Sequence, residues 1–139
     1  MAIPQTLTLE VATPTGLALS VEAESVQTQS VNGELGVLPG HLPILVATRA
    51  GLLKYRVGGK DKVAAIGSGF AEAGPTKVLV LADAFVAPES IDRAAVKVEL
   101  EAAEKALKET KEPRDSHVFQ ELQLALDWAN AKLAAAGEG

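Results

Sequence analysis

The residues of this chain that could take part in catalysis or hold a metal ion are few and widely separated. The sequence has two histidines, His41 and His117, and no cysteine. Without cysteine, a thiolate zinc site and a disulfide framework are excluded. The two histidines fall in different predicted elements, and the sequence identifies no carboxylate partner for either. We therefore expect no catalytic residue and no metal site.

A glycine-rich segment comes nearest to a nucleotide-binding motif. Residues 67–72 read Gly-Ser-Gly-Phe-Ala-Glu, which begins like a dinucleotide fingerprint, but Glu72 stands where the last glycine is needed. No helix is predicted after this segment, whereas the fingerprint needs a helix N-terminus to hold the pyrophosphate. The chain also lacks a G-x-x-x-x-G-K-[ST] phosphate loop and a nucleophile elbow. A Rossmann site is therefore rejected, whereas composition alone leaves a Ser/His/Asp triad open.

The most informative segment is residues 33–45, Gly-Glu-Leu-Gly-Val-Leu-Pro-Gly-His-Leu-Pro-Ile-Leu. Glycine adopts positive φ without steric cost, while proline fixes φ near −65° and lacks an N–H donor. Three glycines and two prolines therefore exclude a helix, and we interpret the segment as a shaped turn between two strands. Its plainest interpretation is a structural loop, in which His41 is a hydrogen-bonded structural group and not a catalytic base.

Composition limits the class of protein. A chain of 139 residues with 47% hydrophobic residues is long enough for one domain plus an appendage. Its net charge of −5 argues against nucleic acid as a partner. No apolar run approaches the ~20 residues of a membrane span, and the N-terminus lacks a signal-peptide pattern. We expect an intracellular, soluble chain that is at most peripheral to a membrane.

The hydrophobic pattern divides the chain in two. Leu7, Leu9 and Val11 alternate with polar residues, as do Leu17, Leu19 and Val21; this period of two indicates strands with one buried face. Four more strands are expected, at 44–48, 52–57, 62–66 and 77–81. Short strands separated by Gly, Pro and Asn turns favour an antiparallel β-sandwich, which we assign to residues 1–87.

Helical periodicity replaces the alternation after Phe85. Apolar residues then recur every three or four positions in two stretches, which predicts an α-helical hairpin over residues 88–139. Its helices are expected at roughly 91–111 and 116–135, and Ser90 is a candidate N-cap of the first. The many alanines favour helix but bury little area, so the pair should be stable as helices and weakly docked.

The segment around residue 40 resembles a signature of the epsilon subunit of the F-type ATP synthase (the mitochondrial delta subunit). The matching residues are Gly33, Gly36, Val37, Pro39, Gly40, His41 and Pro43. Further matches follow in the family's order at Gly51, 67–72 and 78–83, and then come the two helical segments. The resemblance covers nearly the whole chain, and this ordered set is more specific than a lone Pro-Gly-His.

The resemblance implies a non-catalytic rotor subunit that couples rotation of the c-subunit ring to the gamma subunit and so to ATP synthesis. The implied contacts with the ring and gamma involve Glu34, Gly36, Pro39, Gly40 and His41. The helical hairpin would extend along gamma toward the alpha and beta subunits and inhibit ATP hydrolysis. The implied location is the cytoplasmic face of a bacterial plasma membrane, peripheral to it through the complex.

Some bacterial members of the family carry an ATP-binding motif at the start of the first helix. Ile91 and Asp92 match its opening, but Ala95 stands at its arginine position, and Trp128 and Lys132 fall where the last helix has arginines. Phosphates need fixed cations, so we expect no cofactor and at most weak ATP binding. The alternative to the whole assignment is a small β-sandwich protein-binding module with a helical dimerisation tail.

Overall fold

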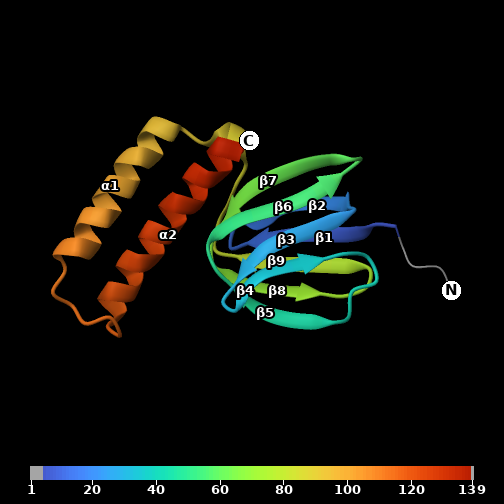
Figure 1. The fold of residues 1–139 in the computed structure, drawn as a ribbon, viewed down its shortest axis with the longest axis horizontal. Helices are drawn as coiled ribbons and strands as arrows, with labels where there is room; N and C mark the ends of the chain where they lie inside the picture. The colour runs from blue at the N-terminus through green and yellow to red at the C-terminus, as the bar shows by residue number, and fades with distance from the viewer. Residues whose placement is uncertain (1–4, 139) are drawn as a thin grey trace.

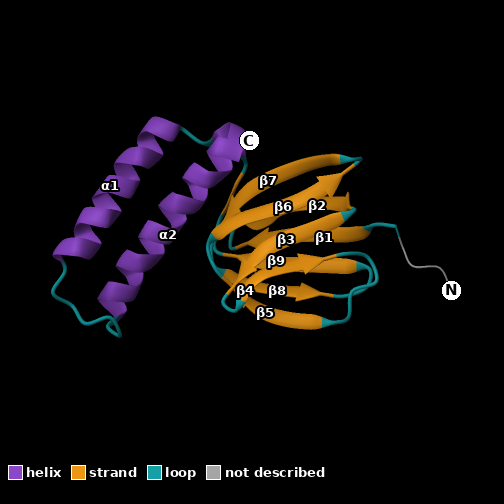
Figure 2. Ribbon diagram, viewed as in Figure 1, coloured by secondary structure: helices purple, strands orange, loops and turns teal. Residues whose placement is uncertain are grey.

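The computed structural model describes residues 5–138, which form ten strands and two α-helices (Figures 1 and 2). The fold is the expected β-sandwich followed by a helical pair. The strands are β1 (Leu7–Thr13), β2 (Gly16–Ala23), β3 (Ser25–Ser30), β4 (Gly33–Val37), β5 (Ile44–Thr48), β6 (Gly51–Val57), β7 (Lys60–Ile66), β8 (Gly69–Ala73), β9 (Lys77–Ala82) and β10 (Phe85–Val86). A short 3₁₀ turn, η1 (Pro88–Ser90), precedes the helices α1 (Arg93–Glu109) and α2 (His117–Glu138).

The strands follow one hydrogen-bonded path that folds over into two layers. Its order is β10-β7-β6-β3-β5-β8-β9-β1-β2, with β4 paired to β3. All pairs are antiparallel except β1 with β9. The path turns over at β3, because Ser25–Gln27 pair with β6 whereas Ser30 pairs with Thr48 of β5. Strand β3 therefore belongs to both layers.

The core lies between the layers. Leu7, Leu9 and Val11 of β1 are fully buried, which confirms the expected inward face of this strand. The opposite layer contributes Leu53 and Ile66, also with no exposed surface. At ~25 cal/mol per Å² of buried apolar area, burial of these branched side chains stabilises the sandwich.

The helical pair packs on one end of the sandwich. Helix α2 lies on the outer face of β6 and β7, and α1 packs substantially only on α2 (Figure 1). The interface with the sheet centres on Ala65 of β7 and on Ala131 and Ala135 of α2, with Ile91 and Trp128 at its margin. Alanine side chains bury little apolar area, so this interface contributes less stabilisation than the core.

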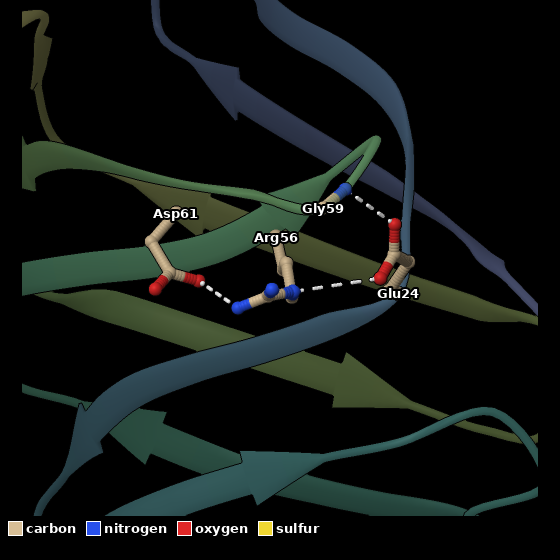
Figure 3. Close-up of polar contacts among 4 residues, drawn as sticks. All are labelled: Glu24, Arg56, Gly59 and Asp61. Atoms are coloured by element: carbon tan, nitrogen blue, oxygen red, sulfur yellow. Dashed lines mark hydrogen bonds and ion pairs between the residues drawn. The ribbon is translucent and has the colours of Figure 1, made fainter.

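A charged cluster ties two connections together at one end of the sandwich (Figure 3). The Arg56 guanidinium lies 3.5 Å from Glu24 and 3.0 Å from Asp61. The other Glu24 oxygen accepts a hydrogen bond from the Gly59 N–H at 2.8 Å. The Glu24 carboxylate thus links the β2–β3 connection to the β6–β7 hairpin. Because these groups are exposed, the ion pairs add little stability.

The structure corrects three sequence-based expectations. Residues 33–37, interpreted as part of a turn, form strand β4, because Gly36 has an extended backbone and pairs with Gln27 of β3. Ser90 does not cap α1; Asp92 is the N-cap, and its carboxylate accepts a hydrogen bond from the Ala95 N–H. Leu17, expected to point inward, is 62% exposed because the β1–β2 register shifts between residues 11 and 12.

Candidate protein-interaction sites

The proline and glycine of the central motif build a tight turn at residues 38–41. The His41 N–H donates to the Leu38 carbonyl at 3.1 Å, which closes a four-residue turn. Pro39 takes the second position and Gly40, at φ +89°, the third. This is the pattern of a type II turn, in which the third position requires positive φ and therefore favours glycine.

This turn is anchored to the sandwich and projects from it. The Gly40 N–H donates to the Pro75 carbonyl of the β8–β9 connection at 2.8 Å. The His41 ring Nδ1 lies within hydrogen-bonding distance of the next carbonyl, that of Leu42, so the imidazole is engaged locally. The β4–β5 connection lies at the end of the sandwich away from the helices (Figure 1). Its backbone is therefore fixed while its outer side chains are open to a partner.

Two leucines flanking the turn are its most exposed apolar side chains, and the sequence analysis did not single them out. Leu38 is 64% exposed and Leu42 is 80% exposed. Their signal in the sequence is a pair of large apolar residues on either side of a Pro-Gly-His turn. The exposure of two large apolar side chains on one projecting turn indicates a contact surface.

The remaining motif residues lie on a different surface. Glu34 and Gly36 are exposed on β4, opposite Gln29 and Gln27 of β3. They share a strand face that is polar, and a Cβ added to Gly36 would meet no atom within 4 Å. The five predicted contact residues are thus close in the chain but divide between the turn and the outer face of β4.

A second apolar surface lies on the outer face of the layer formed by β5, β8, β9, β1 and β2. Side chains paired directly across five strands form a line, which we call the apolar row: Ala47, Phe70, Leu81, Ala12 and Leu17. Phe70 is 55% exposed and Leu81 is 49% exposed. Such a contiguous exposed stripe on a sheet is typical of a protein–protein interface.

The residues matched to a nucleotide motif serve structural roles. Asp92 caps α1 through the Ala95 N–H at 3.2 Å, and Ile91 packs against the alanine interface below α2. Lys132, at a position where the family's last helix has an arginine, forms an ion pair with Glu99 and lies over the Trp128 ring. Among residues 5–138, Ile91 and Asp92 are engaged in packing and capping and Lys132 is already paired, so these three residues do not form a cationic cradle for a triphosphate.

The side chains that could support catalysis are not brought together. His117 lies at the start of α2, where its Nε2 is 2.9 Å from the Glu121 carboxylate, and His41 lies in the distant turn. Within residues 5–138 no three His, Cys, Asp or Glu side chains cluster as metal ligands. No helix in this range has the length and apolar character of a membrane span.

Comparisons with known proteins identify the family of this chain. The sequence model of the family described as "ATP synthase, Delta/Epsilon chain, beta-sandwich domain" matches residues 6–88. The chain is 38% identical over 130 residues to the ATP synthase epsilon chain of Magnetococcus marinus, covering 94% of this chain and 93% of that one. It is 37% identical over 131 residues to the epsilon chain of Desulfitobacterium hafniense, covering 94% and 96%.

Solved structures share the fold. A chain of the Euglena gracilis mitochondrial ATP synthase, in its OSCP/F1/c-ring assembly, superposes with a TM-score of 0.81 at 25% identity, covering 98% of this chain and 84% of that chain. A chain of the Tetrahymena thermophila mitochondrial ATP synthase central stalk and c-ring gives a TM-score of 0.59 at 12% identity, covering 95% and 99%. The second likeness concerns the fold alone.

Proposed function

The chain belongs to the family of ATP synthase delta and epsilon chains, and from this membership we infer that it is a non-catalytic subunit of the F1 central stalk. Its relatives match over both the sandwich and the helices, with 94% of this chain covered. An unrelated binding module with a dimerisation tail would not produce this match. The chain acts by binding its neighbours in the complex, and its own residues perform no chemical step.

The apolar row is the structural observation that supports this inference, because it offers an exposed apolar surface to a stalk partner. Phe70 and Leu81 are paired neighbours at its centre, on β8 and β9. A protein partner that covers such side chains removes apolar area from water and gains ~25 cal/mol per Å². We assign the apolar row to the gamma subunit, the rotor partner that runs beside the sandwich.

The turn at residues 38–43 is assigned to the c-subunit ring. It lies at the end of the sandwich away from the helices (Figure 1), and its rigid backbone presents Leu38 and Leu42 outward. His41 lies in this turn and would add a polar contact to ring loops. Glu34, near the start of β4 on its outer face, is proposed as a separate polar contact. This contact would transmit torque from the ring to the stalk.

Residues 88–139 are proposed to act as a regulatory unit separate from the sandwich of residues 1–87. The fully buried residues of the docking interface under α2 are alanines, and the larger Leu52, Ile91 and Trp128 around them stay partly exposed, which permits release of the helices at modest cost. Extended helices would reach the alpha and beta subunits and inhibit ATP hydrolysis. Exposed cations suited to that contact are Lys97, Lys105, Lys108, Lys111 and Arg114.

The complex places the chain peripheral to a membrane, and its bacterial relatives support a position on the cytoplasmic face of the plasma membrane.

The assignment of the apolar row is tested by co-purification of gamma with a tagged chain. Phe70→Glu should reduce recovered gamma at least tenfold, because a charge would be buried without a partner. Val98→Glu, at an exposed valine of α1, is the matched control.

Circular dichroism of both variants checks that the fold is retained. Equal recovery of gamma with Phe70→Glu and Val98→Glu would remove the apolar row from the interface. Failure of the unaltered chain to recover gamma would contradict the stalk assignment itself.

A further inference from the structure

One ion pair joins the two helices near the end of the hairpin that is docked on the sheet. The Lys132 ammonium of α2 contacts the Glu99 carboxylate of α1. The Lys132 side chain is only 14% exposed, whereas Glu99 is 52% exposed. It is the one salt bridge between α1 and α2 among those found in residues 5–138.

The same lysine also lies over the chain's tryptophan. Its Nζ is 5.4 Å from the centre of the Trp128 ring, one helical turn earlier on α2. A cation at this distance from an indole face is attracted by the ring quadrupole. Trp128 in turn packs against the alanine interface between α2 and β7. The ring therefore contacts both the inter-helix ion pair and the surface that docks α2 on the sheet.

These contacts couple hairpin closure to docking. Helix α1 packs substantially only on α2, so its position depends on the contacts between the helices. If α1 moved away, the Lys132 ammonium would lose its carboxylate partner, and the pair that joins the two helices would be broken. A partly buried ion pair stabilises the arrangement that keeps both partners together. The ion pair therefore opposes opening of the hairpin, while the contact with Trp128 holds the ammonium beside the docking interface.

We propose that Glu99, Lys132 and Trp128 form a latch that holds the helical hairpin closed and docked without a bound nucleotide. The proposal deepens the regulatory role given above for residues 88–139 and rests on it. It also agrees with the poor fit to ATP, because Lys132, at a position where the family's last helix has an arginine, is already paired. The balance between the closed and open hairpin then depends on these three side chains and on ionic strength.

The latch is tested on the full-length chain by the distance between α1 and α2. The sequence has no cysteine, so Ala94→Cys and Ala134→Cys, at exposed positions of the two helices, accept spin labels selectively. Double electron–electron resonance spectroscopy then measures the distance between the two labels and gives the populations of closed and open hairpins. The test variants are Lys132→Met, which keeps the apolar stem, and Glu99→Gln. Glu101→Gln is the control.

Both test variants should lower the closed-to-open ratio about fivefold or more, whereas Glu101→Gln should leave it unchanged; Glu101 is an exposed acid of α1 without an ion pair among the described residues. Lys132→Arg should retain closure, because arginine keeps the charge and stacks on indole. Raising NaCl from about 0.05 to about 0.5 M should open the unaltered chain but not Lys132→Met, since salt screens ion pairs.

Closed populations in both test variants equal to that of the Glu101→Gln control would overturn the latch. A second arm measures ATP hydrolysis by the assembled complex, where an opened latch should lower the rate. If the hairpin opens in the spin-label experiment and hydrolysis is unchanged, the latch stands and the inhibitory function proposed for the hairpin fails. The two failures are therefore distinguishable.

Discussion

Replacing Gly69 with alanine should destabilise the sandwich more than any other glycine-to-alanine change among the strands. A Cβ built on Gly69 would lie 1.8 Å from the Leu81 carbonyl oxygen and 2.8 Å from its carbonyl carbon. Both atoms belong to the backbone of β9 and cannot rotate away. Gly69 pairs with Ala82 on one side and Thr48 on the other, so β8 has no free direction in which to move.

The magnitude follows from this overlap. A carbon–oxygen contact settles near the ~3.5 Å optimum of nonbonded atoms, so β8 and β9 must separate locally by more than about 1 Å. Overpacking of this kind costs about 1–3 kcal/mol. Loss of the hydrogen bonds that join Gly69 to its neighbours adds about 1 kcal/mol for each bond. We expect the free energy of unfolding to fall by roughly 3–5 kcal/mol.

Urea denaturation of the full-length chain, followed by far-ultraviolet circular dichroism, measures this change. Gly36→Ala is the matched control, since Gly36 also lies in a strand, has no positive φ and would meet no atom within 4 Å. Its free energy of unfolding should change by less than about 0.5 kcal/mol. Equal stability of the two variants would contradict the argument that Gly69 packs too closely against β9 to accept a Cβ.

Four further outcomes are expected. Truncation after Ala87 should raise ATP hydrolysis by the complex several-fold without preventing assembly, as measured on the purified complex; an unchanged rate would contradict the inhibitory role. Leu42→Ser should leave the chain's own stability within about 0.5 kcal/mol, while reducing ATP-driven proton pumping in membrane vesicles. Thr28→Val removes a buried hydroxyl for which no hydrogen-bond partner is found, so the unfolding free energy should rise by about 1 kcal/mol. Burial, together with the charge of Glu89, raises the pKa of Tyr55 above its ordinary value of 10.0; stability present below pH 10 is therefore lost as pH rises through the raised pKa, and Tyr55→Phe should abolish that loss in alkaline denaturation curves.

Much of the sandwich could be predicted because its strands bury one apolar face. Strand β1 alternates throughout, and β5 has the expected bounds. Strand β3 was missed because two of its three inward-facing residues, Thr28 and Ser30, carry hydroxyls. A strand whose buried side is largely polar shows no alternation of hydrophobicity. Strand β4 was missed because its two glycines resemble turn residues.

The candidate surfaces were predictable to different degrees. The turn at residues 38–41 follows from local chemistry, since Pro39 and Gly40 meet the conformational demands of a type II turn. The apolar row depends on register across five strands, which local sequence does not specify. Leu17 joins this row only because a register shift in the β1–β2 pair reverses its direction. No pattern within β2 alone could have indicated that exposure.

Trp128 is the only tryptophan of the chain, and it lies where the helices, the lysine and the sheet meet. Indole emission depends on surrounding polarity and on nearby charge. The native protein therefore contains an optical probe where the helical pair meets the sheet, and stopped-flow fluorescence of the unlabelled chain would time the release of the helices proposed above.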